Sequence, residues 1–208
     1  MYEPHLDMNR DKLVEIHQTD DPDAIIKKCV RNLLVVLGDD PDREGLKETP
    51  SRVMRMCEEI FRGMRYTNSE IAQKFNKCFE DVETGDLVVE SNIPIHSFCE
   101  HHLMLMYDMN VAIGYIPKGK VIGLSKLARI ADMVGRRLQL QERIGTDIAD
   151  ILQEILGTDD IIVVIQGKHG CMTARGIKAR ESITRTATLR GRFQSDSDLK
   201  SEFYSLIQ

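Results

Sequence analysis

A run of alternating apolar residues in the middle of the chain is the feature that most constrains its fold. Tyr107, Met109, Val111, Ile113 and Tyr115 occupy every second position and alternate with smaller or polar residues. A period of two is the period of a β-strand whose two faces meet different surroundings. Shorter runs after about residue 86 predict further strands at 87–89, 161–165 and 182–189.

Helical spacing of apolar residues dominates the first part of the chain. Residues 23–37 predict an amphipathic helix with Pro22 at its entry. Thr49 is expected to cap a second helix, with Pro50 at its first position and its end near Gly63.

Two more helical segments follow the first predicted strands. Residues 127–156 carry helical spacing with a break near Gly135, and residues 198–207 predict a last helix. The order is two helices, strands, a long helical segment, more strands and a short helix. This order favours an α+β fold with an antiparallel sheet over alternating βαβ units.

The size and charge of the chain exclude several classes of protein. Its 208 residues suffice for one domain with a buried core, with or without a helical appendage. A net charge of −5 argues against binding nucleic acid through a general basic field. No apolar stretch is long enough for a membrane span, and the N-terminus is too charged for a secretory signal. We therefore expect a cytoplasmic protein without nucleic-acid or membrane partners.

The five cysteines are odd in number and widely spaced, which favours reduced thiols over a disulfide framework. Cys29 and Cys57 lie on the apolar stripes of the two predicted helices and are expected to pack in the core. Cys99 and His102 are three residues apart, so a turn or a helical start would point both side chains to one side, with His101 pointing elsewhere. A C-x-x-H pair alone equally fits a buried thiol beside an unrelated imidazole.

A third soft ligand is offered by the segment His169-Gly170-Cys171. Cys99, His102 and Cys171 would match the three-ligand arrangement of catalytic zinc, which leaves a fourth position for water. Zinc would lower the pKa of that water, and His101 and His169 would be available for proton transfer. The spacing leaves open a closed zinc site in which one histidine is the fourth ligand.

A local excess of basic residues stands out in this acidic chain. Residues 168–192 contain seven lysines and arginines and a single acid, Glu181. Lys126 and Arg129 lie one helical turn apart beside Ser125, which is expected to cap a helix. Such groups can hold a polyphosphate through charge-assisted hydrogen bonds and a helix N-terminus. A solvated cationic surface fits the same pattern, and the sequence has no P-loop or G-x-G-x-x-G motif.

Together these motifs resemble the GTP cyclohydrolase I family. The resemblance extends from about Pro22 to the end of the chain. It implies the tunnelling fold, an antiparallel sheet with two helices packed on one face, with an N-terminal helical extension. It also implies a toroidal homodecamer with active sites between subunits. The motifs that carry it are DPDREGLKETPSRV at 40–53, CEHH at 99–102, IPKGKVIGLSKLARI at 116–130, RRLQLQERI at 136–144 and HGCMTARG at 169–176.

The same resemblance implies an activity and a set of site residues. The activity would be zinc-dependent conversion of GTP and water to 7,8-dihydroneopterin triphosphate and formate, the first step of pterin and tetrahydrofolate synthesis. The matching positions are Cys99, His102 and Cys171 for Zn²⁺; His101 and His169 for proton transfer; Ser125 for the ribose rearrangement; Lys126, Arg129 and Arg175 for the triphosphate; and Gln141 and Glu142 for the guanine edge.

The resemblance also divides the chain. We expect an N-terminal segment of uncertain order at 1–21, an N-terminal helical region at 22–85 and a catalytic domain at 86–208. The sequence departs from the family pattern at 182–188, where the family often has lysine at 183, valine at 185 and serine at 187. No expected ligand lies there, so the departure concerns only the local strand surface and any regulatory partner, which the sequence does not identify.

Two rival functions share some of these features. A nitrile reductase acting on a deazaguanine has the same fold, but it needs a catalytic cysteine and a nicotinamide site instead of a zinc site with two cysteines. A non-catalytic purine-binding or zinc-storage module would keep the metal ligands. It would have no use for Ser125, His101 and His169.

Overall fold

The computed structural model describes residues 12–82 and 85–208. The chain forms two compact units that divide after Ile60. In the first unit α1 (Pro22–Val36) packs against α2 (Thr49–Ile60). Asp21 caps α1 by accepting a hydrogen bond from the Ala24 amide. Both predicted helices are confirmed, although Thr49, the expected cap, is the first residue of α2, and Cys29, expected in the core, is exposed. The part of segment 1–21 that precedes residue 12 lies outside the described residues.

The second unit is built on a five-stranded sheet with the order β5-β2-β3-β6-β7. All neighbouring pairs are antiparallel except β2 and β5, which are parallel. A separate antiparallel ribbon pairs β1 with β4. The strands are β1 (Cys78–Val82), β2 (Val88–Cys99), β3 (Leu105–Tyr115), β4 (Gly119–Ile122), β5 (Leu138–Gln139), β6 (Ile161–His169) and β7 (Thr184–Leu189).

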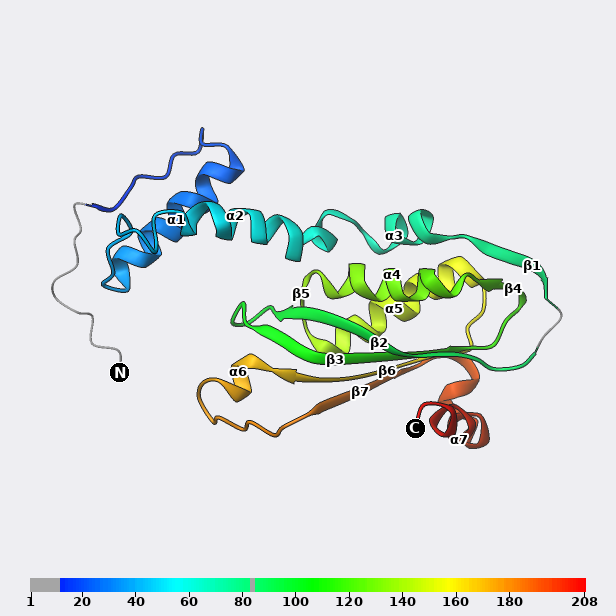
Figure 1. Ribbon diagram of the computed structural model, residues 1–208. Helices are drawn as coiled ribbons and strands as arrows, with labels where there is room; N and C mark the ends of the chain where they lie inside the picture. Colours follow the sequence, from blue (N-terminus) through cyan, green and yellow to red (C-terminus); the bar gives the residue numbers. More distant parts are fainter. Residues whose placement is uncertain (1–11, 83–84) are drawn as a thin grey trace. The chain divides into compact units, whose positions relative to one another are not determined.

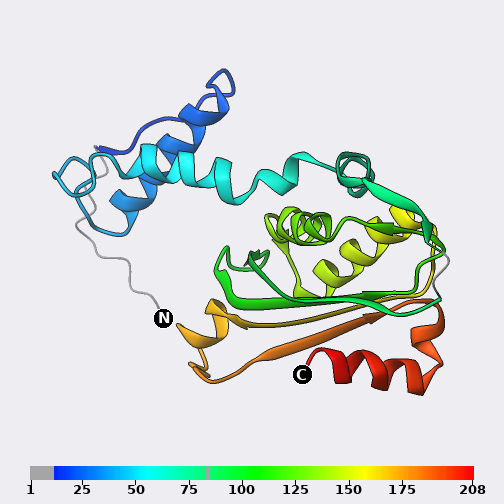
Figure 2. The ribbon, with the colours of Figure 1, turned by 45° about the vertical axis from the view of Figure 1, so that its right-hand side comes forward.

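Helices cover both faces of this sheet. Figures 1 and 2 show α4 (Leu124–Gly135) and α5 (Gln141–Leu156) on one face and α7 (Ser197–Leu206) on the other. The break predicted near Gly135 separates α4 from α5. The shorter helices are η2 (Arg62–Arg65), α3 (Asn68–Phe75), α6 (Gly170–Thr173) and η3 (Gly191–Gln194).

The main core lies between the sheet and the pair α4 and α5. Ile113 on β3, Leu127 on α4 and Ile148 on α5 are completely buried in it. A smaller core on the other face contains Phe203 of α7, and a Cβ on Gly114 of β3 would lie 2.6 Å from the Phe203 ring. Both faces of β3 are therefore covered. An antiparallel sheet with two helices on one face agrees with the expected tunnelling fold.

Helix α3 was not predicted, although the sequence contains its start signal. Thr67 accepts a hydrogen bond from the Glu70 amide, and the Glu70 carboxylate accepts one from the Thr67 amide, which is a capping box. Because α3 packs against α4 and α5, it belongs to the second unit. The compact units divide after Ile60, and the expected division of the chain after residue 85 stays a prediction.

The sheet has strand edges on both sides. β7 pairs only with β6, and β2 has a strand neighbour on its outer side only at Phe98 and Cys99, where β5 runs. Within residues 12–82 and 85–208, the remaining length of that side of β2 pairs with no strand.

Candidate metal and substrate site

The turn between β2 and β3 brings Cys99 and His102 together. The Cys99 carbonyl accepts hydrogen bonds from the His102 and Leu103 amides at 3.3 and 2.9 Å. The Cys99 amide in turn donates to the Met104 carbonyl at 2.9 Å. The resulting tight turn places Cys99 Sγ 3.9 Å from His102 Nδ1. Of the two local structures that the sequence allowed for this pair, the chain uses a turn.

Strand register brings Cys171 to the same place. β3 and β6 pair with Met106 opposite His169, so β6 ends beside the start of β3. Helix α6 begins at Gly170 and carries Cys171 in its only turn. A Cβ on Gly170 would lie 2.9 Å from a backbone oxygen of β3, so glycine is what allows this close approach. The ligand atoms of Cys99, His102 and Cys171 all lie within 4.8 Å of one another.

The donor atoms and their spacing fit a metal ion. Tetrahedral zinc with sulfur at about 2.3 Å and nitrogen at about 2.0 Å separates those two ligands by roughly 3.5 Å. The 3.9 Å between Cys99 Sγ and His102 Nδ1 requires only a shift of a few tenths of an ångström. Burial and the neighbouring Cys99 thiol raise the pKa of Cys171. Binding of an ion must therefore displace a proton from this thiol.

His101 lies nearer to this cluster than the sequence indicated. Its Nδ1 is 3.9 Å from Cys99 Sγ, the same distance as His102 Nδ1, whereas we expected the ring to point elsewhere. His101 does not belong to the group whose ligand atoms are mutually close. The ring is exposed and borders the cluster, so it is available to a molecule bound there.

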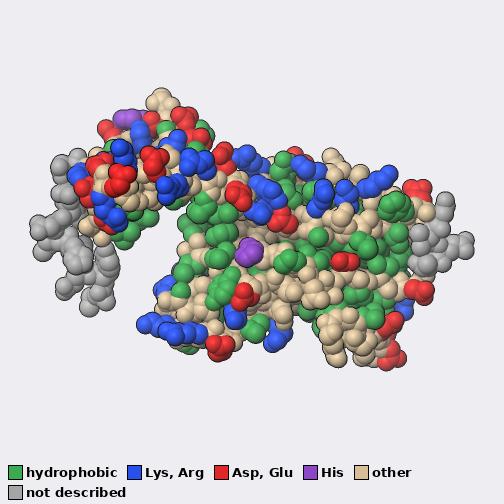
Figure 3. Space-filling view, viewed as in Figure 1, with side chains coloured by type: hydrophobic (Ala, Val, Ile, Leu, Met, Phe, Trp, Pro, Cys, Tyr) green, Lys and Arg blue, Asp and Glu red, His purple; other side chains and the backbone are tan. Residues whose placement is uncertain are grey.

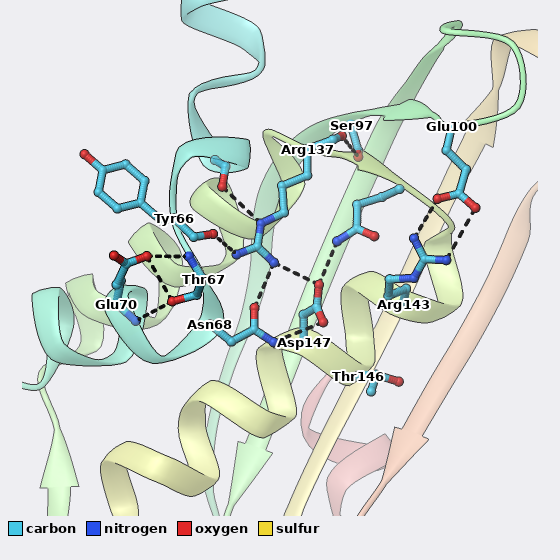
Figure 4. A network of polar contacts seen from close by, with 12 residues as sticks. Tyr66, Thr67, Asn68, Glu70, Ser97, Glu100, Arg137, Arg143, Thr146 and Asp147 are labelled. Carbon is cyan, nitrogen blue, oxygen red and sulfur yellow. Dashed lines mark hydrogen bonds and ion pairs between the residues drawn. The ribbon is translucent and has the colours of Figure 1, made fainter.

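A polar network fixes the start of α5 beside Cys99 (Figure 4). Arg137 donates to the carbonyl of Tyr66 and pairs with Asp147 in the second turn of α5. Gln139 donates to the same Asp147 carboxylate at 2.8 Å. Gln139 also stands opposite Cys99 in the parallel pairing of β5 with β2. The second turn of α5, and with it the first turn, is thereby attached to the strand that carries Cys99.

Glu142 lies exposed in that first turn. Among the described residues its carboxylate forms no ion pair, because Arg137 binds Asp147 and Arg143 binds Glu100 at 2.6 Å. A surface pair of Glu142 with a neighbouring arginine is therefore not observed among the described residues. Burial lowers the pKa of His169, and the negative charge of Glu142 opposes this effect. Glu142 is thus close enough to act on the His169 ring.

Gln141, unlike the adjacent Glu142, is buried. Its side chain is 1% exposed. The amide nitrogen Nε2 contacts the carbonyl oxygens of Ile165 and Thr184, both at 3.1 Å. The amide oxygen Oε1 lies 2.9 Å from His169 Nε2. The expectation that this side chain holds the guanine edge disagrees with its burial, because both polar ends already have partners inside the chain.

The predicted triphosphate residues Lys126 and Arg129 lie on α4, together with Ser125. The cap of α4 is Gly123 and not Ser125, which lies inside the helix. The Ile122 amide just before α4 donates to the Tyr115 hydroxyl at 3.3 Å. Tyr115 ends β3, about 30 Å along the strand from the end where the cysteines meet. Figures 1 and 2 show β4, which leads into α4, at the opposite end of the sheet from α6.

Arg129 lines a surface pocket of about 420 Å³ with three other cations, Arg62, Arg65 and Lys74, and one acid, Asp132. Figure 3 shows Lys and Arg side chains gathered over the part of the second unit where α3 and α4 lie. Arg175, by contrast, follows α6, and its charge acts to lower the pKa of Cys171. One chain therefore presents basic groups in two separate places, only one of which adjoins the cysteines.

The fold and the cluster together define a class of protein: a tunnelling-fold chain with two cysteines and one histidine arranged for a metal ion. Comparison with known proteins gives the family. The chain belongs to the GTP cyclohydrolase I family, whose model matches residues 26–208.

The similar proteins are bacterial. A GTP cyclohydrolase 1 of Clostridium botulinum (strain Loch Maree / Type A3) is 58% identical over 186 residues, which cover 87% of this chain and 95% of that protein. The GTP cyclohydrolase 1 of Clostridium acetobutylicum is 56% identical over 187 residues, covering 88% and 96%. That of Clostridium beijerinckii is 57% identical over 182 residues, covering 85% and 92%. These relatives are enzymes, and the chain matches nearly their whole length.

Proposed function

We propose that this chain converts GTP and water to 7,8-dihydroneopterin triphosphate and formate, with Zn²⁺ held by Cys99, His102 and Cys171. The observation that carries the proposal is the convergence of three soft ligands from two segments about seventy residues apart. Zinc in such a site supplies a Lewis acid and activates water for hydrolysis. Thiolate and imidazole ligands suit zinc, although iron or cobalt would accept the same set.

The side chains around the cluster have distinct roles in this proposal. His101 and His169 move protons during ring opening and release of formate. His101 Nδ1 lies 3.9 Å from Cys99 Sγ, and His169 is two residues before Cys171 in the chain. Glu142 accepts hydrogen bonds from guanine N1–H and the exocyclic amino group, since its carboxylate has no ion pair among the described residues. Arg175 contacts the triphosphate next to the cysteines.

The remaining groups are proposed to come from a second copy of the chain. Ser125, Lys126 and Arg129 lie toward the end of the sheet opposite the cysteines, too far to share one GTP with them. A complete site then needs the cysteines of one subunit and the start of α4 of another. We propose a ring-shaped homo-oligomer, of which a toroidal decamer is the expected form.

A cytoplasmic location completes the proposal. No helix within residues 12–82 and 85–208 is long and apolar enough to span a bilayer. GTP is present in the cytoplasm, and reduced thiols such as the proposed zinc ligands persist there. We propose no membrane or nucleic-acid partner.

Incubation with GTP tests the proposal directly. The purified metal-loaded protein is incubated with GTP, with and without a chelator, and the product is oxidised and detected by pterin fluorescence. Fluorescent pterin and formate that both disappear with the chelator are expected. A protein that binds GTP without forming pterin would be a non-catalytic module, and nicotinamide-dependent reduction of a deazaguanine nitrile would identify the reductase.

A further inference from the structure

The carboxamide of Gln141 joins the first turn of α5 to β6 and β7. Its Nε2 lies 3.1 Å from the Ile165 carbonyl oxygen, 3.1 Å from the Thr184 carbonyl oxygen and 3.3 Å from Thr186 Oγ1. On its other side Oε1 lies 2.9 Å from His169 Nε2. A Cβ on Gly167 would lie 3.5 Å from this Oε1 and 2.7 Å from Met109 Cγ. The amide oxygen thus lies close to Gly167 as well as to His169.

The neighbours of this amide determine which way it faces. Backbone carbonyl oxygens only accept hydrogen bonds, and the amide nitrogen brings two N–H donors. With Nε2 toward Ile165 and Thr184, both donors are satisfied. The reversed amide would place its oxygen about 3.1 Å from two carbonyl oxygens in a buried position, where oxygen faces oxygen and repels it. The amide oxygen therefore faces His169.

The orientation of the amide then determines the proton on the imidazole. Oε1 of Gln141 has no proton to donate, so the 2.9 Å contact is a hydrogen bond only if His169 Nε2 carries a hydrogen. In a neutral ring Nδ1 is then the unprotonated nitrogen. Within the described residues Nδ1 has no hydrogen-bond partner.

We propose that Gln141 is a positioning residue that fixes the orientation of the His169 ring and holds it as the Nε2–H tautomer, with Nδ1 turned away from Gln141. Gln141 then acts on the reaction through His169 and not by contact with guanine. The catalytic part of this inference rests on the proposed function, whereas the tautomer does not.

Neutron diffraction from metal-loaded crystals exchanged into D₂O at alkaline pH tests the tautomer without any substrate. We expect deuterium on His169 Nε2, none on Nδ1, and two deuterium atoms on Gln141 Nε2 that point to the Ile165 and Thr184 carbonyls. Deuterium on His169 Nδ1, with or without a second one on Nε2, would overturn the inference.

The kinetics of three variants test whether Gln141 positions His169 for the reaction. Gln141→Met removes the amide at similar length, and kcat for GTP should fall by on the order of 10²-fold with KM little changed, the lower range of what acid–base catalysis contributes. Gln141→Glu keeps an oxygen for His169 Nε2–H and should recover a large part of kcat. The matched control is Gln153→Met, an exposed glutamine of the same helix, which should behave as the parent.

The outcomes separate the inference from the proposed function. A rise in KM with kcat intact, together with a lost preference for GTP over inosine triphosphate, would make Gln141 a base-reading residue and overturn the positioning role. Equal losses of kcat in Gln141→Met and Gln141→Glu would also overturn the positioning role. If the parent protein forms no pterin from GTP, the proposed function fails, and the neutron result still decides the tautomer.

Discussion

Arg137 and Asp147 form an ion pair with 3.0 Å between Nη1 and Oδ2, and their side chains are only 13% and 14% exposed. Arg137 also donates to the Gly63 carbonyl and to the Asn68 side chain, so it joins the segment before α3 to α5. Removing one partner of such a pair leaves a largely buried charge without compensation.

Replacing Arg137 is therefore expected to destabilise the second unit. Arg137→Met should lower the free energy of unfolding by about 3 kcal/mol, the lower range for breaking a buried pair. Urea denaturation followed by circular dichroism measures the change. The matched control is Arg143→Met, which breaks the more exposed pair with Glu100 and should cost much less stability, because water screens exposed pairs. Equal effects of the two substitutions would contradict a structural role for the Arg137 network.

Removal of one proposed metal ligand should abolish the activity and leave the fold intact. Cys171→Ser is expected to lose both the metal and pterin formation, because the sheet register, and not the ion, holds the two ligand segments together. Metal content by mass spectrometry, activity and the circular dichroism spectrum are measured on one preparation. Cys29→Ser, in the first unit, is the control and should keep all three. Full activity in a metal-free Cys171→Ser protein would rule out the zinc assignment.

Base recognition should depend on Glu142. Glu142→Gln replaces one acceptor oxygen by a donor that would face a guanine donor, so turnover of GTP should fall steeply while zinc is retained. Once the bound guanine covers Glu142, loss of a hydrogen-bond partner there should reduce discrimination between the correct base and its analogue by roughly 10⁴. The preference for GTP over inosine triphosphate, which lacks the amino group, should narrow. Normal turnover with unchanged discrimination would show that another residue recognises the base.

Subunit exchange tests the composite site. His102→Ala removes a cluster ligand, and Lys126→Ala removes a group on α4 near the opposite end of the sheet. Each variant should be inactive alone, and mixing under exchange conditions should restore part of the activity. His102→Ala mixed with Glu142→Ala serves as the negative control, because Glu142 lies near His169 in the same chain. A fully active monomer in sedimentation would contradict the composite site.

Much of the fold was predictable from periodicity. The alternation from Tyr107 to Tyr115 gave β3 almost to its ends, and Pro22 and Gly135 marked real helix boundaries. The long strand β2 was predicted only at its start. Burial alternates along β2 from Asn92 to Cys99, but a buried position is the polar Ser97 and the run contains Pro94, so the sequence lacks a clear apolar alternation. The ribbon of β1 and β4 is too short to carry a periodic signal.

The candidate site was likewise predictable from the sequence only in part. The spacing of Cys99, His102 and Cys171 together with the family motifs anticipated the cluster, and the structure places their ligand atoms within reach of one ion. Sequence could not indicate that His101 also approaches Cys99, since this depends on the turn after β2. Nor could it distinguish adjacent Gln141 and Glu142, one of which is buried and the other exposed. That difference arises from the way the first turn of α5 sits on β6 and β7.

The two unequal edges of the sheet have a consequence for handling the protein. Within the described part of the chain the outer sides of β2 and β7 carry backbone amides and carbonyls that no neighbouring strand pairs along most of their length. When no copy of the protein occupies them, any extended chain can pair with them. Dilution or mild denaturant that separates subunits should thus produce a species that precipitates before it unfolds. Solubility, followed by light scattering during dilution, would then decline earlier than secondary structure, and storage at high protein concentration would preserve the sample better than storage at low concentration.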